Sequence, residues 1–386
     1  MTTLYKTPTM KKLLLVLLLF TGMVNAQIVA IPDAILKAKL VAANPTDTDN
    51  KIAQNFSDQW MTIDANGDGE IQVSEAQAVK FLFVSHSAIT DITGLTSFSN
   101  LQNLSLILSE MTSLDLNALT SLRTLYCYNM PHLTSISMNN LTNLTEINFI
   151  SLYNLTSLNV SSLTSLTKLS CIYGGLTTLN VNGLTNLTEL NCSGNQLTNL
   201  NGLPNITKLN CSENLLTTLN LTGLSNLVEL DCSSNQLTSL SGLPNLTQLN
   251  CSYNQLTTLN VNGLTNLNTL FCSGNNYTSF TLNGLPNLVT LGCNGNIDLT
   301  TVSLTNLPLL QDANVVGTVD MSANPIGHLT SLTLSGLPNL QKLNCSNSIL
   351  TSLNLNGLNS LTEIICSRNQ LTSLNVSNLP NLQKLI

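Results

Sequence analysis

The densest group of potential ligand atoms in the chain lies between residues 64 and 75, in the sequence DANGDGEIQVSE. Carboxylate and amide side chains alternate there with other residues, and Gly69 permits a sharp turn. Calcium takes about six to eight hard oxygen ligands, and a twelve-residue stretch of this composition supplies that density. We therefore expect a calcium site. The alternative is an acidic, solvated turn that holds no metal.

This stretch resembles the calcium loop of EF-hand proteins. The resemblance implies a role for each residue of the pattern. Asp64, Asn66 and Asp68 would supply side-chain oxygens, and Glu70 would supply its backbone carbonyl. Gln72 would act at the ninth position, often through water, and Glu75 would supply a bidentate carboxylate. Ile71 is expected to pack inward. The flanking helical patterns are short and there is no partner loop, so we expect one structural ion rather than a paired sensor.

Most of the chain outside this loop consists of a short sequence repeat. The phrase Leu-x-x-Leu-x-Cys-x-x-Asn-x-Leu is clear from residue 187 and returns from residues 227 and 267. Its cysteines follow at steps of 19 or 21 residues, at positions 171, 192, 211, 232, 251, 272 and 293. Self-similarity at this period is typical of a solenoid, in which each repeat packs only on its neighbours.

The phrase resembles the leucine-rich repeat, and repeats this short resemble those of secreted bacterial proteins of the internalin type. The resemblance covers about residues 81–386 and implies a β-rich solenoid of about 14 repeats, with short parallel strands and extended or 3₁₀ backing. In the turn after each strand we expect an asparagine, such as Asn195, to bond backbone groups that strand pairing leaves free. The pattern stops in mid-repeat at Ile386, which we interpret as truncation.

The inward position of the repeat can be followed along most of the chain. It begins in a first strand at residues 82–84 and reaches Cys171 through Val84, Leu106, Cys127 and Phe149. After Cys293 the next good match contains Met321 and Asn324, which predicts an insertion of about seven residues near 311–317.

Groups that could carry catalysis are scattered or buried. All ten cysteines fall at the inward position, where we expect buried free thiols; disulfides between neighbouring strands are the alternative, but they would strain the sheet. His86, His132 and His328 lie in distant repeats, so they cannot share a metal ion or a nucleophile. No P-loop or Gly-x-Ser-x-Gly sequence is present. We expect a protein that is not an enzyme.

Alternation along the strands predicts which side chains face the concave surface. One outward column alternates in charge over five repeats, from Glu146 to Glu229, and we interpret it as ion pairs that support register. In the N-terminal third, aromatic and aliphatic residues replace the polar residues of later repeats, which is typical of a binding surface. These candidate partner-binding residues are Tyr126, Tyr128, Ile150, Ile172 and Tyr173. Alternatively, the cap or an insertion covers them, or these repeats shift register.

Two segments precede the repeats. Residues 1–26 contain a basic start, a short apolar run and a cleavage site ending at Ala26, as in secretory signal peptides. Residues 27–80 are expected to form a small helical cap over the apolar end of the first repeat. Pro32 lies in the first turn of one short helical pattern, and Phe56, Trp60 and Ile63 recur at helical spacing in another.

Composition limits the partners. Charged residues are 9% of the chain, the formal net charge is −7 and no basic cluster occurs, so nucleic acid is not expected as a partner. No transmembrane segment is expected in the mature chain. We expect a secreted or cell-surface module that recognises an extracellular protein or glycan through its concave face, with a structural Ca²⁺ in the cap. The alternatives are a passive structural or adhesive rod, and the targeting arm of a larger enzyme whose C-terminal part is missing.

Overall fold

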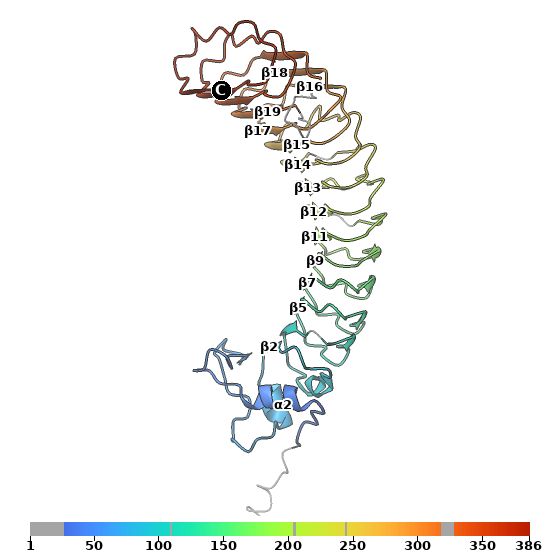
Figure 1. Ribbon diagram of the computed structural model, residues 1–386. Helices are drawn as coiled ribbons and strands as arrows, with labels where there is room; N and C mark the ends of the chain where they lie inside the picture. The colour runs from blue at the N-terminus through green and yellow to red at the C-terminus, as the bar shows by residue number, and fades with distance from the viewer. Residues whose placement is uncertain (1–26, 109, 204–205, 244, 318–327) are drawn as a thin grey trace, which may run out of the picture.

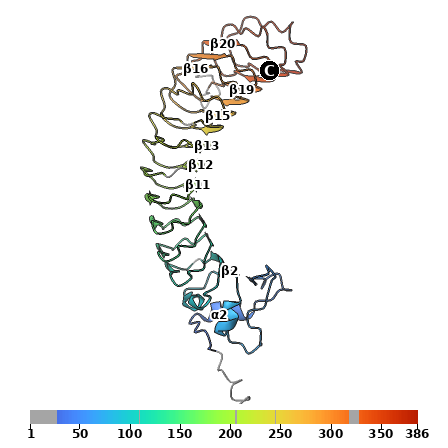
Figure 2. The same cartoon turned by 180° about the vertical axis from the view of Figure 1, so that it is seen from behind.

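The chain winds into an arc-shaped solenoid in the computed structural model, which describes residues 27–108, 110–203, 206–243, 245–317 and 328–386 (Figure 1). The strands lie along the inner, concave edge of the arc, and turns and short backing segments form its outer edge, as the view from behind also shows (Figure 2). The predicted signal peptide lies outside the described residues. None of the helices within the described ranges is long and apolar enough to cross a membrane.

The concave surface is one sheet of 16 strands, all parallel to their neighbours except β1, which pairs antiparallel with β2. In spatial order the strands are β1 (Ala53–Gln54), β2 (Phe81–Ser85), β3 (Asn103–Ile107), β5 (Thr124–Tyr128), β7 (Glu146–Ile150), β9 (Lys168–Ile172), β11 (Glu189–Asn191), β12 (Lys208–Asn210), β13 (Glu229–Asp231), β14 (Gln248–Asn250), β15 (Thr269–Phe271), β17 (Thr290–Gly292), β19 (Asp312–Asn314), β21 (Lys342–Asn344), β22 (Glu363–Ile365) and β23 (Lys384–Leu385). The predicted first strand is confirmed as β2. Because β1 belongs to the cap, the sheet continues from the repeats into it.

The remaining elements are small. Three further parallel sheets are formed by β4 (Ser113–Asp115) with β6 (Ser135–Ser137), by β8 (Ser157–Asn159) with β10 (Thr178–Asn180), and by β16 (Ser279–Asn283), β18 (Thr301–Thr305) and β20 (Ser331–Ser335). The helices of the described residues are α2 (Ala34–Val41), α3 (Val73–Gln77) and the 3₁₀ helix η1 (Thr93–Ser97). The predicted β-rich solenoid with extended and 3₁₀ backing is confirmed.

Inward side chains form one continuous core along the solenoid. Leu190, Cys192, Leu197 and Leu200 of a single repeat are all buried, as the period predicts. Nine of the ten cysteines are buried free thiols, and Cys366 is half-buried. Burial raises the pKa of Cys192 to about 12. These thiols are therefore neutral near pH 7 and pack as small apolar side chains.

The asparagine of the repeat bonds the turn that follows each strand. Asn235 donates through Nδ2 to the carbonyls of Cys211 (3.0 Å), Cys232 (3.2 Å) and Ser233 (3.1 Å), while its Oδ1 accepts from the N–H of Leu216 (3.0 Å). One amide therefore links two neighbouring repeats and satisfies four backbone groups, which confirms the prediction. The same pattern recurs at Asn195, Asn214, Asn254 and Asn369.

The cap is less helical than predicted. The helix near Pro32 is confirmed as α2, although Pro32 precedes it and Asp33 caps it. The helix predicted from Phe56, Trp60 and Ile63 is wrong. Instead, Asn55 Oδ1 accepts hydrogen bonds from the N–H groups of Ser57 and Gln59, and Trp60 pairs antiparallel with Gln54. An asparagine that bonds its own following backbone competes with helix formation, and the outcome here is a tight turn.

The register predicted after Cys293 is also wrong. Strand β19 pairs with β17 so that Ala313 lies opposite Leu291, which places Val315 at the inward position. Asn314 lies opposite Asn344 on the next strand of the sheet. Cys345 therefore occupies the same inward position in the next repeat as Val315 does in this one. The extra residues therefore follow Val315 rather than occupying 311–317. The phrase around Met321 and Asn324 lies outside the described residues.

Candidate functional site

The predicted calcium loop wraps around the carboxylate of Asp64. Its Oδ1 accepts hydrogen bonds from the N–H groups of Gly67 (2.8 Å) and Asp68 (3.2 Å), and its Oδ2 accepts from the N–H of Gly69 (2.9 Å). Gly67 and Gly69 have φ values of +72° and +81°, a region that favours glycine. The two glycines thus let the chain curl until its N–H groups point at one acidic side chain.

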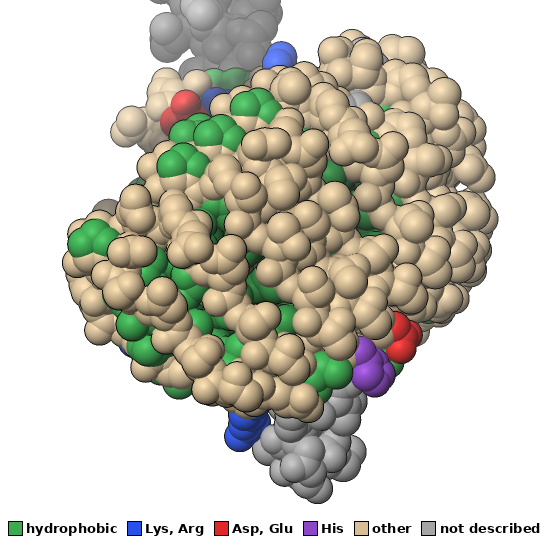
Figure 3. All heavy atoms as spheres, turned by 90° about the horizontal axis from the view of Figure 1, so that it is seen from above, with side chains coloured by type: hydrophobic (Ala, Val, Ile, Leu, Met, Phe, Trp, Pro, Cys, Tyr) green, Lys and Arg blue, Asp and Glu red, His purple; other side chains and the backbone are tan. Residues whose placement is uncertain are grey.

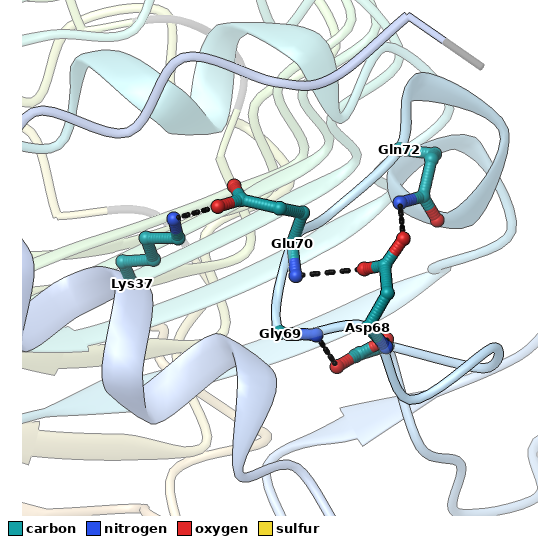
Figure 4. Close-up of polar contacts among 6 residues, drawn as sticks. Lys37, Asp68, Gly69, Glu70 and Gln72 are labelled. Carbon is teal, nitrogen blue, oxygen red and sulfur yellow. Dashed lines mark hydrogen bonds and ion pairs between the residues drawn. The ribbon is translucent and has the colours of Figure 1, made fainter. Parts of the chain in front are cut away.

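Asp68 lies at the centre of a second set of contacts (Figure 4). Its Oδ1 accepts from the N–H of Glu70 (2.8 Å), and its Oδ2 accepts from the amides of Asn66 (2.9 Å) and Gln72 (3.0 Å). The bond from the Glu70 N–H, followed by the bond from Asn66, lowers the pKa of Asp68 below its ordinary value. Asp68 therefore keeps its charge through neutral and mildly acidic pH.

Two glutamates have different roles at the loop. Glu75, in the first turn of α3, closes the loop: its Oε1 accepts from the N–H of Ala65 (2.8 Å) and its Oε2 from the N–H of Gln72 (2.9 Å). The side chain of Glu70 points away from the other loop residues and pairs with Lys37 Nζ of α2 at 2.6 Å (Figure 4). The side chain of Glu70 is thus engaged outside the loop, and the role of its backbone carbonyl stays a prediction.

The donor set of the loop fits a hard cation. Across the described ranges, no three His, Cys, Asp or Glu side chains are placed to hold one metal ion together. In the loop, the carboxylates of Asp64 and Glu75 bond backbone N–H groups. However, the side chains of Asn66, Asp68 and Gln72 touch one another, and a half-turn of either amide exchanges its nitrogen for its oxygen. The fold thus brings all six predicted ligands into one loop. Their role as ligands stays a prediction.

The loop gains a strand partner from the N-terminal segment, which was not foreseen. Ile28 pairs antiparallel with Gln72, the N–H of Val29 donates to the carbonyl of Ile71 (2.8 Å), and the N–H of Val73 donates to the carbonyl of Gln27 (2.8 Å). Ile71 is fully buried, as predicted. The short apolar run of residues 28–31, which is rich in β-branched residues and ends at Pro32, is the sequence signal that could have indicated this strand.

Three of the candidate partner-binding residues form a row on adjacent strands. Tyr128 lies opposite Ile150, and Ile150 lies opposite Ile172, at the C-terminal ends of β5, β7 and β9. Tyr128 is 49% exposed, and the two isoleucines are half-buried. The row is therefore a continuous apolar strip at one margin of the concave sheet.

The other two candidates differ from this row. Tyr126 donates its hydroxyl to Glu146 Oε1 (2.9 Å), and partial burial, followed by this hydrogen bond, raises the pKa of Tyr126. It is therefore tied to its neighbour in the sheet. Tyr173 is 50% exposed and lies in the turn after β9, with φ of +52°. It follows Ile172, the last residue of the row, directly in the sequence.

The charged column pairs across strands as predicted. Lys168 bonds Glu189 (3.3 Å) and Lys208 bonds Glu229 (2.9 Å). A second alternating run was missed because the register after Cys293 was wrong; it consists of Asp312, Lys342, Glu363 and Lys384. The outward residues of β7 to β15 line a groove of about 620 Å³ along the concave face.

Comparisons with known proteins agree with this architecture. A family model described as Leucine Rich repeats (2 copies) matches residues 225–264. The functional domain of InlJ from Listeria monocytogenes, which includes a cysteine ladder, is similar with a TM-score of 0.62 and 27% identity; the match covers 92% of this chain and 74% of that one. The chain therefore has a leucine-rich-repeat fold.

Its structural neighbours include internalins. An internalin, InlF, from Listeria monocytogenes matches with a TM-score of 0.51 and 21% identity, over 92% of this chain and 95% of that one. Comparison with curated protein sequences gives no match. This chain also has a column of inward cysteines, one from each of successive repeats.

Proposed function

We propose that the protein is a recognition module that binds a protein partner at the margin of its concave face. The observation that carries the proposal is the apolar row of Tyr128, Ile150 and Ile172, which lies in register on three adjacent strands. Most later repeats place serine or another polar residue in this column, as at Ser193 and Ser212, and Val316 is an exception. A contiguous apolar patch rimmed by polar residues on a rigid surface is typical of protein interaction sites.

The fold supports binding rather than catalysis. Leucine-rich-repeat folds are typical of protein-binding modules, and their repeats hold outward side chains at fixed spacing. Seen from above, the surface is mostly uncharged, with apolar side chains gathered in patches between polar ones (Figure 3). The cysteine thiols, which are the strongest nucleophiles by type, are packed in the core with raised pKa values.

We further propose that the protein acts outside the cell and that Ca²⁺ stabilises its cap. The signal-peptide pattern of residues 1–26 supports export. The six oxygen donors of the loop would hold the ion, and the pair between Glu70 and Lys37 connects the loop to α2. Extracellular modules of this ligand type bind calcium at about 10⁻⁴–10⁻³ M, so millimolar calcium would load the site substantially.

A passive structural rod is the second candidate, and one contact favours it. A Cβ atom on Gly194 would lie 2.5 Å from Cδ1 of Tyr173, so this exposed ring covers the glycine of the next repeat. Tyr173 therefore has a structural role whether or not it also contacts a partner. The row formed by Tyr128, Ile150 and Ile172 has no such glycine beneath it and decides between the two functions.

A capture experiment tests the proposal. The immobilised full-length protein is exposed to extracellular proteins in millimolar calcium, beside a Tyr128→Ser/Ile150→Ser variant and a Leu215→Ser control. Leu215 is 43% exposed and lies outside the row, so its variant removes an exposed apolar side chain without changing the row. We expect one partner to bind the wild type and the control and to lose about tenfold or more in affinity for the row variant. Equal binding by all three proteins, or binding by none, would favour the passive rod.

A further inference from the structure

The outward face of the concave sheet changes character at β14, β15 and β17. On both sides acidic and basic side chains alternate, from Glu146 to Glu229 and from Asp312 to Lys384. The outward residues of the three strands between these runs carry no charge. We call this surface the neutral window; it consists of Gln248, Asn250, Thr269, Phe271, Thr290 and Gly292.

An aromatic ring lies at the centre of the neutral window. Phe271 is 41% exposed, and a Cβ atom on Gly292, its partner on β17, would lie 2.8 Å from the ring Cδ1. Beside the window, Tyr253 is 63% exposed and covers Gly274 in the same way, at 2.6 Å. Both rings thus rest against bare backbone and present aromatic surface to solvent.

Uncharged hydrogen-bonding groups surround the Phe271 ring. Gln248 is exposed and Thr290 is half-buried, so an amide and a hydroxyl are available on the two strands that flank β15. Both groups can donate and accept hydrogen bonds. Asn250 is held in place, since its Nδ2 donates to Asp231 Oδ2 (3.2 Å) and its Oδ1 accepts from the N–H of Ser252 (3.2 Å).

We propose that the neutral window binds a neutral glycan chain. A sugar ring has an apolar C–H face, which an aromatic ring can cover, and a rim of hydroxyl groups, which amides and hydroxyls can bond. Asp231 and Asp312 lie at opposite borders of the window and disfavour a glycan that carries carboxylate or sulfate groups. A protein partner fits less well, because the window is polar apart from one ring and lacks a continuous apolar row.

The dimensions of the surface suit a chain rather than a single sugar. Neighbouring strands are about 4.8 Å apart, so the window measures about 10 Å from β14 to β17. Gln248, Asn250, Thr269 and Phe271 also line the groove that continues along the concave face toward β7. A glycan anchored on Phe271 would therefore have room to extend along this groove. This site is separate from the apolar row, and its proposal does not depend on a protein partner.

Affinity electrophoresis tests the proposal with soluble polysaccharides as probes. The full-length protein is run in gels that contain β-1,3-glucan, β-1,4-glucan or galactomannan, which are neutral, or alginate, which is anionic. We expect at least one neutral polymer to slow the protein and alginate to have no effect. Phe271→Leu, which keeps an apolar cover over Gly292 but removes the ring, should weaken the interaction about tenfold. Phe271→Tyr, which keeps the ring, should retain it.

A matched pair of charge variants controls for loss of folding. Thr290→Asp adds a carboxylate inside the window, whereas Thr301→Asp adds one on β18, which belongs to another sheet. We expect only Thr290→Asp to abolish the slowing, with both variants keeping the wild-type circular-dichroism spectrum; Thr290 lies opposite Asp312, so Thr290→Asp should lower the melting temperature slightly. No slowing by any neutral polymer, equal slowing of wild type and Phe271→Leu, or slowing by alginate alone would overturn the proposal. Capture of a protein partner that is lost on Thr290→Asp, without glycan binding, would overturn it as well.

Discussion

The ring of Tyr173 covers Gly194, its neighbour in the next repeat, and the relationship recurs in the array. Tyr253 covers Gly274, and Phe271 covers Gly292. In each pair the glycine follows the aromatic residue by one repeat, so the missing side chain leaves room for the ring. Aromatic cover of a neighbouring glycine stabilises sheets by shielding exposed backbone. Each ring thus shields the backbone of the next repeat with one face and leaves its other face to solvent.

The pair of Tyr253 and Gly274 makes a direct prediction. Gly274 has φ of +62°, and an added Cβ would lie 2.6 Å from the ring, so Gly274→Ala meets both backbone strain and a clash. We expect a loss of about 1–3 kcal/mol in unfolding free energy. In a Tyr253→Ala background the clash is gone and the added loss should shrink, measured as the coupling energy of a double-mutant cycle from urea unfolding. Additive effects would show that the ring and the glycine do not interact.

The asparagine of the turn makes a second prediction. Asn235→Asp keeps the size and one oxygen but removes the N–H groups that reach Cys211, Cys232 and Ser233, and it brings a negative charge near three carbonyls. We expect a loss of about 2–4 kcal/mol, because buried carbonyls lose their donors. Asn262→Asp, at an exposed position of another turn, is the control and should change stability by less than about 0.5 kcal/mol. Equal thermal shifts for both variants would contradict the argument.

The repetitive part of the fold was predictable because one physical rule recurs. The spacing of Leu190, Cys192 and Leu197 determines which side chains face the core, and the register of one repeat then transfers to the next. The turn role of Asn195 follows from the same spacing, since a small buried amide needs partners. The charged pairs on β9, β11, β12 and β13 follow as well.

The parts that could not be predicted are those where a single local interaction determines the backbone conformation or the register. Around Trp60 the helical spacing of apolar residues competes with an Asn55 turn, and periodicity does not report the strength of such a turn. After Cys293 the inward position is taken by Val315, a residue that does not match the cysteine of the phrase. In the candidate loop, the six residues could be named from the sequence, but the strand partner at Ile28 and the Lys37 contact depend on tertiary folding.

The junction of the cap and the first repeat should be sensitive to acid. Asp33 Oδ1 accepts from the N–H groups of Ile35 and Leu36, and its Oδ2 accepts from those of Thr90 and Asp91. Partial burial acts to raise the pKa of Asp33, but the bonds from Thr90 and the other N–H groups outweigh it and lower the pKa. Because folding lowers this pKa, the ionised Asp33 stabilises the folded state at pH values above its unfolded pKa, which is about 4. This stabilisation is lost as the pH falls through the folded pKa.

We therefore expect Asp33→Ala to cost about 1–2 kcal/mol at pH 7, through loss of the helix cap and of the contact with the first repeat. The difference from wild type should begin to narrow below about pH 4, the unfolded pKa, and should be lost as the pH falls through the lowered folded pKa of Asp33. Urea unfolding at pH 7, 5 and 3 measures this. A difference that is constant over the whole range would show that the charge of Asp33 is not involved.

Calcium should stabilise the protein through the loop and not through general charge screening. At a calcium concentration of about 100 times Kd, binding adds about 2.7 kcal/mol to the folded state. Asp64→Ala should abolish both calcium binding, measured by isothermal titration calorimetry, and the rise in melting temperature. Glu70→Gln is the matched control: its side chain contacts Lys37 and its carbonyl is unchanged, so it should keep calcium binding. The same calcium shift in wild type and Asp64→Ala would rule out the site.

The thiols of the core should react in an order set by burial. Cys366 is half-buried, whereas Cys192, Cys211 and Cys232 are fully buried, and burial raises the pKa of Cys192 to about 12. Since the thiolate is the reactive form, a thiol reagent at pH 8 should label Cys366 first and the inner thiols only after unfolding. Mass spectrometry of the labelled protein identifies the site. Cys366→Ser should remove the rapid phase, and all remaining thiols should react in denaturant. Rapid labelling of Cys192 or Cys211 in the folded protein would mean that the solenoid opens in its central repeats.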